Sequence, residues 1–154
     1  MKTTQDKLAQ LLPADLIAHA ERTSMPYLGY HVFRQTICQQ LLGDSEAPIL
    51  HWIGKDIGRK IPITSSQGLL FPFIRLGLGK LEVLSESANR FTYRLTHPMY
   101  DYLPAERLGQ SLSLECGILA GAISRWQDRE AEVHLEIHQA AGGTQLEARI
   151  TVNC

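Results

Sequence analysis

The sequence predicts an α+β fold, in which a four-stranded antiparallel sheet carries helices on one face, in the order ααα-ββ-α-ββ. Two observations lead to this prediction. Before residue 80 the apolar residues recur every three to four positions, which is the period of a helix, whereas two later paired segments alternate apolar and polar residues, as strands do. The alternation leaves one face of each hairpin polar, which is typical of an antiparallel sheet with one solvated face. Helices packed against the apolar face are the simplest assembly of these elements.

The chain divides at about residue 26. Residues 1–26 hold leucines and isoleucines at near-helical spacing, interrupted by Pro13 and closed by Pro26, and they predict an N-terminal helical extension that packs loosely or touches a partner. Residues 27–154 predict one α+β domain. The whole chain has 154 residues, of which 44% are hydrophobic and 20% charged, which suits one globular domain with a sizeable core.

Three helices are expected before the sheet. The first spans residues 29–43, where Gly43 ends the pattern. The second spans residues 46–61, with Pro48 in its first turn and Pro62 beyond its end. The third runs towards Gly77 and contains Pro72, so that it either starts late, with this proline near its first turn, or kinks.

Two hairpins and one long helix complete the chain. Residues 80–87 and 90–97 alternate apolar and polar side chains and are joined by a short polar segment, as are residues 131–138 and 145–153 around an AAGGT turn. Between the hairpins, a long helix is expected to begin near Pro104 and to bury its apolar positions.

Two of these helices carry a pair of glycines at a spacing of four residues. Gly54 and Gly58 lie on the second helix, and Gly117 and Gly121 on the long helix. A glycine inside a helix costs about 1 kcal/mol relative to alanine. The spacing therefore predicts that another backbone, of a helix or of the sheet, approaches each helix closely at these glycines.

Composition excludes several classes of protein. The formal net charge is −1 and the basic residues are scattered, which does not favour nucleic-acid binding. No apolar run reaches the roughly 18 residues of a membrane span, and the first residues lack the layout of a signal peptide, so we expect a cytoplasmic protein. Cys38, Cys116 and Cys154 are far apart and odd in number, which does not favour a disulfide framework or a zinc site.

No motif of catalysis or metal binding stands out, so we predict no catalytic residues and no metal site, and the sequence indicates no cofactor. His134, Glu136 and His138 share the polar face of one strand, but two histidines four residues apart lie about 13 Å from each other along a strand, too far for one metal ion. The most interesting ionisable residue is Glu115, beside the glycines of the long helix. It is either buried with a hydrogen-bond partner or a raised pKa, or it lies at the helix edge and pairs with an arginine or lysine.

Three segments, in their order and spacing, resemble the YslB-like family of uncharacterised bacterial proteins. They are ILHWIGKDIGRK, LGLGKLEVL and LSLECGILAGAI, and the resemblance covers about residues 30–153. That family is related to the 4-vinyl-reductase small-molecule-binding domain and to the TRAPP-subunit (Bet3-like) fold. The resemblance implies helices on one side of an antiparallel sheet, dimers formed through the early helices, a cavity for apolar or acyl-like ligands between helices and sheet, and no catalytic residues.

Two functions are therefore expected. The first is a non-enzymatic domain that binds an apolar or acyl-like small molecule in a pocket between helices and sheet, lined by Trp52, Phe71, Phe73, Glu115, Cys116 and Leu119. The alternative is a homodimeric scaffold or protein-interaction module with a filled core, in which the early helices form the dimer contact through Phe33, Ile37 and Leu41.

Overall fold

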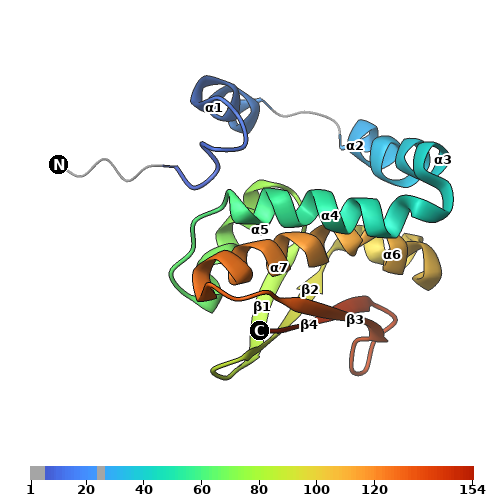
Figure 1. Cartoon of the computed structure of the whole chain (residues 1–154). Coiled ribbons are helices and arrows are strands. Elements are labelled where there is room, and N and C mark those ends of the chain that lie inside the picture. The colour runs from blue at the N-terminus through green and yellow to red at the C-terminus, as the bar shows by residue number, and fades with distance from the viewer. Residues whose placement is uncertain (1–5, 24–26) are drawn as a thin grey trace.

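The computed structural model describes residues 6–23 and 27–154, and it confirms the predicted fold class. Its sheet has four strands in the order β1-β2-β4-β3, and each neighbouring pair is antiparallel. The helices lie on one side of this sheet and leave the other side open (Figure 1). The strands are β1 (Lys80–Glu86), β2 (Arg90–Thr96), β3 (Glu132–Gln139) and β4 (Leu146–Asn153).

The helices form layers above the sheet, with α7 next to the strands and α4 above α7 (Figure 1). The α-helices are α1 (Ala14–Arg22), α2 (Leu28–Val32), α3 (Cys38–Leu42), α4 (Glu46–Arg59), α5 (Leu70–Arg75), α6 (Ala105–Ser111) and α7 (Ser113–Gln127). A π-helical turn, Phe33–Ile37, joins α2 to α3 without a gap, so that residues 28–42 form one continuous helix. None of the helices in the described part of the chain is both long and apolar enough to cross a membrane.

Helix α7 is the centre of the core. Ten consecutive residues, Glu115–Ser124, are buried, as expected for a helix that is covered on every side. The sheet covers one side through fully buried side chains of β2 and β4, among them Tyr93 and Ile150. Helix α4 covers the opposite side.

The contact between α4 and α7 passes through the four glycines. A Cβ atom at Gly54 or Gly58 would overlap the backbone carbonyl oxygens of α7, and one at Gly117 or Gly121 would overlap those of α4. The two backbones therefore touch, and only residues without a Cβ fit between them.

The long helix expected between the hairpins is divided, which corrects the prediction of one element. Helix α6 ends at Ser111, Leu112 has ψ −2°, and α7 begins at Ser113. At this break the carbonyl oxygen of Ser111 accepts a hydrogen bond from Nη2 of Arg34, at 2.9 Å. A side chain inserted into the backbone hydrogen bonds of a helix is a known cause of a bend.

The third expected helix starts late, which was one of its two predicted forms. A short 3₁₀ turn, Ser66–Leu69, precedes α5, and Pro72 is the third residue of α5. Its missing N–H lies in the first turn, where a helix has no internal acceptor for it.

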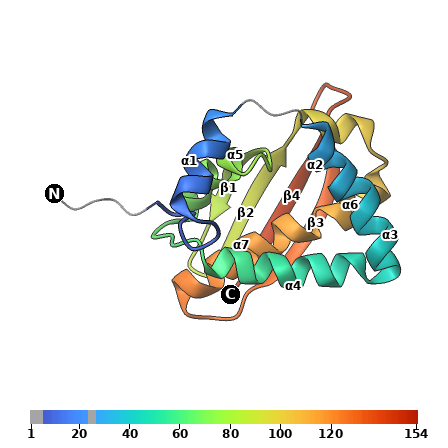
Figure 2. The same ribbon diagram turned by 90° about the horizontal axis from the view of Figure 1, so that it is seen from above.

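The described part of the N-terminal extension packs against the domain. Leu8 and Ile17 are buried in the core, and Arg75 of α5 forms ion pairs with Asp6 at 2.7 Å and Glu21 at 2.6 Å. Figure 2 shows α1 lying over α5 and β1. The extension is therefore attached more firmly than expected, and the domain boundary near residue 27 remains a prediction.

Candidate functional site

A buried ion pair links the α2–α3 helix to α7. The guanidinium of Arg34 faces the carboxylate of Glu115 in a two-pronged contact, with Nη1–Oε1 at 2.9 Å and Nη2–Oε2 at 3.0 Å. Only 5% of Arg34 and 2% of Glu115 is exposed. Glu115 is thus buried with a hydrogen-bond partner, which was the first of the two predicted alternatives. Its partner is an arginine, as the second alternative predicted.

The helix of residues 28–42 directs the side chain of Arg34 into the protein interior. Tyr30, Arg34 and Cys38 are four residues apart and face inward, while Arg34 sits in the π-helical turn. Such turns are rare and are frequently found at functional sites. Nη1 of Arg34 also donates to the Tyr30 hydroxyl at 2.7 Å, and Nη2 donates to the Ser111 carbonyl, so that the guanidinium is held from three elements.

A second buried ion pair supports the first. Arg107 of α6 pairs with Glu46, at the start of α4, and also donates to the backbone carbonyl of Arg34 at 2.9 Å and to Gln35 Oε1 at 3.1 Å. Glu46 is almost fully buried. These bonds join the π-helical turn, α4 and α6 around the Arg34 backbone, and a supported side chain keeps a defined position.

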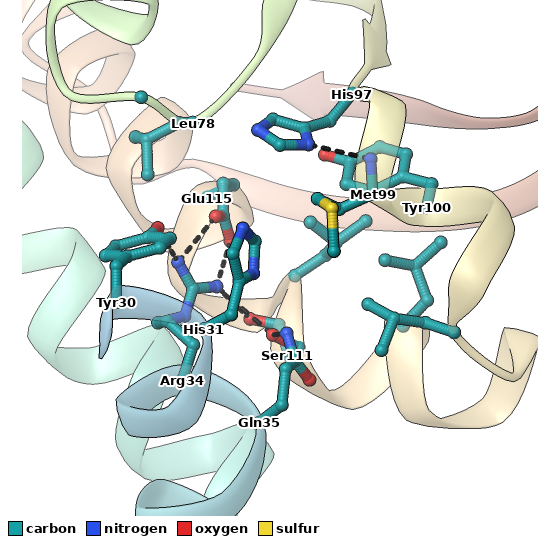
Figure 3. Close-up of a pocket in the computed structure, with 14 residues that line it drawn as sticks. Tyr30, His31, Arg34, Gln35, Leu78, His97, Met99, Tyr100, Ser111 and Glu115 are labelled. Carbon is teal, nitrogen blue, oxygen red and sulfur yellow. Dashed lines mark hydrogen bonds and ion pairs between the residues drawn. The ribbon is translucent and has the colours of Figure 1, made fainter. Parts of the chain in front are cut away.

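Beside the Arg34–Glu115 pair lies a cavity of about 30 Å³, which we call the polar pocket. Its walls come from the α2–α3 helix, from α6 and α7, and from the segments before β1 and after β2 (Figure 3). Five side chains of the wall are apolar and eight are polar or aromatic. The residues are Tyr30, His31, Arg34, Gln35, Gly77, Leu78, His97, Met99, Tyr100, Leu103, Leu108, Ser111, Leu112 and Glu115.

Three buried polar atoms of this wall have no hydrogen-bond partner among the described residues. They are Nε of Arg34, Nε2 of His31 and the hydroxyl of Tyr100. In folded proteins almost all buried polar atoms find a partner in protein or in ordered solvent. All three atoms belong to residues that line this one small cavity.

Both histidines of the polar pocket have a lowered pKa, which favours their neutral form at pH 7. Nδ1 of His97 accepts a hydrogen bond from the backbone N–H of Met99 at 3.1 Å and so carries no proton. Burial lowers the pKa of His97. Burial also lowers the pKa of His31, with further contributions from His97, whose ring centroid lies 5.9 Å away, and from Arg34.

The tyrosines of the pocket are neutral as well. Burial raises the pKa of Tyr30 to about 12 and raises that of Tyr100 further. Since Arg34 and Glu115 cancel each other, the polar pocket carries no net charge at neutral pH. It therefore favours a neutral hydrogen-bonding ligand over a strongly charged one.

The two half-buried histidines predict a pH dependence of stability. The pKa values of His31 and His97 in the folded state lie below the reference of 6.5 that applies to the unfolded chain, so the unfolded chain binds more protons on acidification. We expect the free energy of unfolding to be highest above pH 7 and to fall between pH 7 and pH 5, as measured by urea denaturation at a series of pH values. His31→Gln should reduce the dependence of the free energy of unfolding on pH. His134→Gln, on the exposed face of β3, should leave this dependence unchanged. Equal dependence on pH in the parent and both variants would show that His31 does not contribute to it.

The six residues predicted to line an apolar pocket do not come together. Glu115 lines the polar pocket, Phe73 and Leu119 are fully buried in the core, and Cys116 is buried on α7. Trp52 and Phe71 are 71% and 67% exposed, which corrects their assignment.

The two exposed aromatic residues lie on outward faces of their helices. Trp52 is two residues before Gly54, whose face of α4 is filled by the backbone of α7, so the indole points away from this contact. Phe71 lies on α5 with the guanidinium of Arg75 over its ring, 5.8 Å from the centroid. Apolar character alone does not distinguish an inward from an outward aromatic residue.

The sequence reasoning missed the residues that build the polar pocket, above all Arg34. A single arginine in an amphipathic helix usually lies at the surface. The available signal was Glu115, because an acidic residue in an otherwise apolar, glycine-paired helix needs a buried cation. The described residues contain no group of three His, Cys, Asp or Glu side chains placed to hold a metal ion.

A second hollow lies between the helices and the edge strand β3. We call this open groove, of about 390 Å³, the β3 groove. Its lining is mainly apolar on the strand side and mixed on the helix side: Ala47, His51, Gly109, Ser113, Cys116, Val133, Leu135 and Ile137.

Comparisons with known proteins agree with the fold and with the resemblance seen in the sequence. A crystal structure of a vinyl-4-reductase family protein from Methanocaldococcus jannaschii matches with a TM-score of 0.59 and 18% identity, over 94% of this chain and 91% of that one. The uncharacterized protein YslB of Bacillus subtilis (strain 168) is 23% identical over 125 residues, which cover 81% of this chain and 84% of YslB. The family model described as a protein of unknown function (DUF2507) matches residues 27–152. The chain therefore belongs to this family of proteins of unknown function.

Proposed function

We propose that this chain is a non-enzymatic binding domain that holds a small polar molecule in the polar pocket. The three unpartnered atoms of Arg34, His31 and Tyr100 carry this proposal. Each buried polar atom without a partner costs about 1–3 kcal/mol. A ligand that bonds to them recovers this free energy, and the rigid ion pair beside them needs no rearrangement to receive it.

The chemistry of the described pocket residues supports binding rather than catalysis. Arg34 and Glu115 neutralise each other, and the hydroxyl of Ser111 bonds to Arg34 at 3.2 Å and to Gln35 at 3.1 Å, not to a histidine. Nδ1 of His97 is occupied by the Met99 amide. A nucleophile with an adjacent base, which covalent catalysis needs, is thus not assembled among these side chains.

The size of the polar pocket limits the ligand. A volume of about 30 Å³ holds a few heavy atoms, and a site of this kind also takes one or two water molecules. The apolar part of the wall, with Leu78 and Met99, suits a short hydrocarbon part. We therefore expect a short-chain, polar-headed ligand; a long acyl chain would have to displace the α2–α3 helix.

The Tyr100→Phe variant tests this proposal. Removing an unpartnered hydroxyl should raise the free energy of unfolding of the ligand-free protein by about 1 kcal/mol. The matched control is Tyr93→Phe, because the Tyr93 hydroxyl is also buried but donates to the Ser66 carbonyl at 2.9 Å, so its loss should cost about 1 kcal/mol. Urea denaturation measures both values.

Calorimetric titration with short-chain amides and alcohols, together with native mass spectrometry of the purified protein, provides the second readout. We expect one of these classes to bind the parent protein and to bind Tyr100→Phe at least tenfold more weakly. If Tyr100→Phe is destabilised like Tyr93→Phe, or if no compound binds and only water fills the pocket in a crystal, the proposal is wrong.

The second candidate function is a homodimeric scaffold, and an exposed apolar face supports it. Phe33, Ile37 and Leu41 lie on the outer side of the α2–α3 helix, where Leu41 is 77% exposed and the other two are 55% and 40% exposed. Leu28 and Val32 extend the same exposed surface. Contiguous exposed apolar surface commonly marks a contact with another protein.

We expect Leu41→Glu to weaken self-association through this face, because a charge would be buried at the contact. If this face forms the dimer contact, sedimentation velocity at micromolar concentration should show a dimer for the parent and a monomer for the variant. Leu12→Glu, at an exposed leucine of the N-terminal extension, is the control and should remain dimeric. A parent protein that is monomeric, or a dimer unaffected by Leu41→Glu, contradicts this function.

A further inference from the structure

Strand β3 is an edge strand that lacks several of the features that keep such edges from pairing. It pairs with β4 on one side, in a continuous register from Glu132 opposite Asn153 to Gln139 opposite Leu146, and no described strand pairs with its other side. Its eight residues, EVHLEIHQ, contain no lysine, no proline and no bulge. Proteins commonly use such features to keep the free backbone groups of an edge from pairing with another chain.

The opposite edge of the same sheet is protected. Strand β1 starts with Lys80, its register shifts at a bulge between Val83 and Ser85, and its last residue, Glu86, accepts a hydrogen bond from the Ser66 hydroxyl. The two edges of one sheet therefore differ in the features that prevent pairing.

The inner face of β3 is also incompletely covered. Val133, Leu135 and Ile137 are only partly buried and line the β3 groove, whereas their neighbours on β4, Ile150 and Val152, are fully buried. Branched aliphatic side chains at a sheet edge gain stability when a further strand shelters them.

The side chains of β3 are complementary to a second copy of the same strand. With a two-fold axis at Leu135, antiparallel pairing places Glu132 opposite His138 and His134 opposite Glu136, each pair occurring twice. On the inner face it places Val133 opposite Ile137 and Leu135 opposite itself.

Other registers lose all or part of this complementarity. An axis at His134 would place Glu132 opposite Glu136, and an axis at Glu136 would place His134 opposite His138. Axes between two residues would join the polar face of one strand to the apolar face of the other, because side chains alternate between faces. An axis at Val133 or Ile137 keeps a single kind of Glu–His pair but overlaps fewer residues of the strand. The axis at Leu135 thus gives the longest overlap and the most complementary pairs.

We propose that β3 pairs antiparallel with β3 of a second copy, across a two-fold axis at Leu135, and joins two sheets into one of eight strands. The contact lies at the sheet edge and does not involve the exposed face of the α2–α3 helix or the polar pocket. An isologous contact of this kind closes as a dimer. The open face of the joined sheet remains polar, with a row of alternating glutamate and histidine side chains at the junction.

Charge reversal tests the register directly. His134→Glu places two glutamates opposite each other at two symmetry-related positions and should weaken the dimer about tenfold in sedimentation equilibrium. Adding Glu136→His restores opposite pairs and should recover the affinity of the parent, although within each copy the new histidine faces Arg149 of β4. Thr92→Glu, on the polar face of β2 away from the edge, is the control and should leave the affinity unchanged.

Hydrogen exchange locates the contact. Raising the protein concentration should slow exchange within residues 132–139 and leave residues 80–86 and 28–42 unchanged. A monomer at all concentrations, protection confined to residues 28–42, or a double variant that does not regain affinity would overturn the proposal. Calorimetry on the polar pocket is independent of these results, because none of the substitutions touches its walls.

Discussion

Gly121→Ala is expected to lower the free energy of unfolding by about 3 kcal/mol or more. The new Cβ would overlap the backbone carbonyl of Lys55, and this carbonyl belongs to a regular helix that cannot move without shifting all of α4. Overpacking of a well-filled core generally costs about 1–3 kcal/mol, and here a backbone, not a flexible side chain, has to yield. Chemical denaturation measures the effect, and Gly121→Leu should destabilise at least as much.

Gly109→Ala is the matched control. Gly109 also lies inside a helix, α6, but a Cβ there would meet no atom within 4 Å. Without a clash, alanine should stabilise the protein by roughly 0.5–1 kcal/mol through its higher helix propensity. Two variants with opposite signs would establish that the glycines of α7 are required for close packing; similar values for both would show that the helices separate easily.

Glu115→Ala is expected to cost about 3–5 kcal/mol, because it leaves the guanidinium of Arg34 buried without a counter-ion. The loss comes from the uncompensated charge and does not measure the net stabilisation by the pair. Glu82→Ala is the matched control, since Glu82 pairs with Arg94 at 3.0 Å on the open face of the sheet, where water screens both charges. That change should cost less than about 1 kcal/mol in the same denaturation measurement.

The double variant Glu115→Leu with Arg34→Met separates charge from packing. Replacing both charges by apolar side chains of similar volume should recover most of the stability lost in Glu115→Ala. It should also abolish ligand binding in the polar pocket, since Nε of Arg34 is then absent. If Glu115→Ala lowers the free energy of unfolding no more than Glu82→Ala does, the guanidinium of Arg34 is accessible to solvent. The ion pair is then not a fixed part of the pocket wall.

Several features of the fold were predictable from the sequence because they depend on local spacing. Alternation located the four strands, and the period of the apolar residues located α4 and the helix of residues 28–42. The glycines indicated a close backbone contact, because a helix rarely contains two glycines without a packing requirement. The break at Leu112 was not predictable, since it coincides with a hydrogen bond from Arg34, which is 78 positions earlier in the chain.

Only one residue of the polar pocket, Glu115, could be predicted from the sequence. Glu115 stood out as an acidic residue in an apolar helix, but its partner in the π-helical turn, and the histidines and tyrosines around them, come from separate elements. Trp52 and Phe71 illustrate the opposite error, because an aromatic side chain has the same hydrophobicity whether it faces the core or the solvent. Convergence of side chains is a property of packing and leaves no periodic signal.

The sequence by itself determined the order and type of the elements, the polar face of the sheet and the close approach of two helices. Each follows from short-range spacing, which sets the direction in which a side chain leaves its own helix or strand. Only the tertiary structure decided that the glycines of α4 meet those of α7, that Arg34 neutralises Glu115, and that β3 rather than β1 is left as the open edge. These pairings join residues that are distant in the chain, and the free energy that selects them comes from burial and hydrogen bonding in the assembled fold.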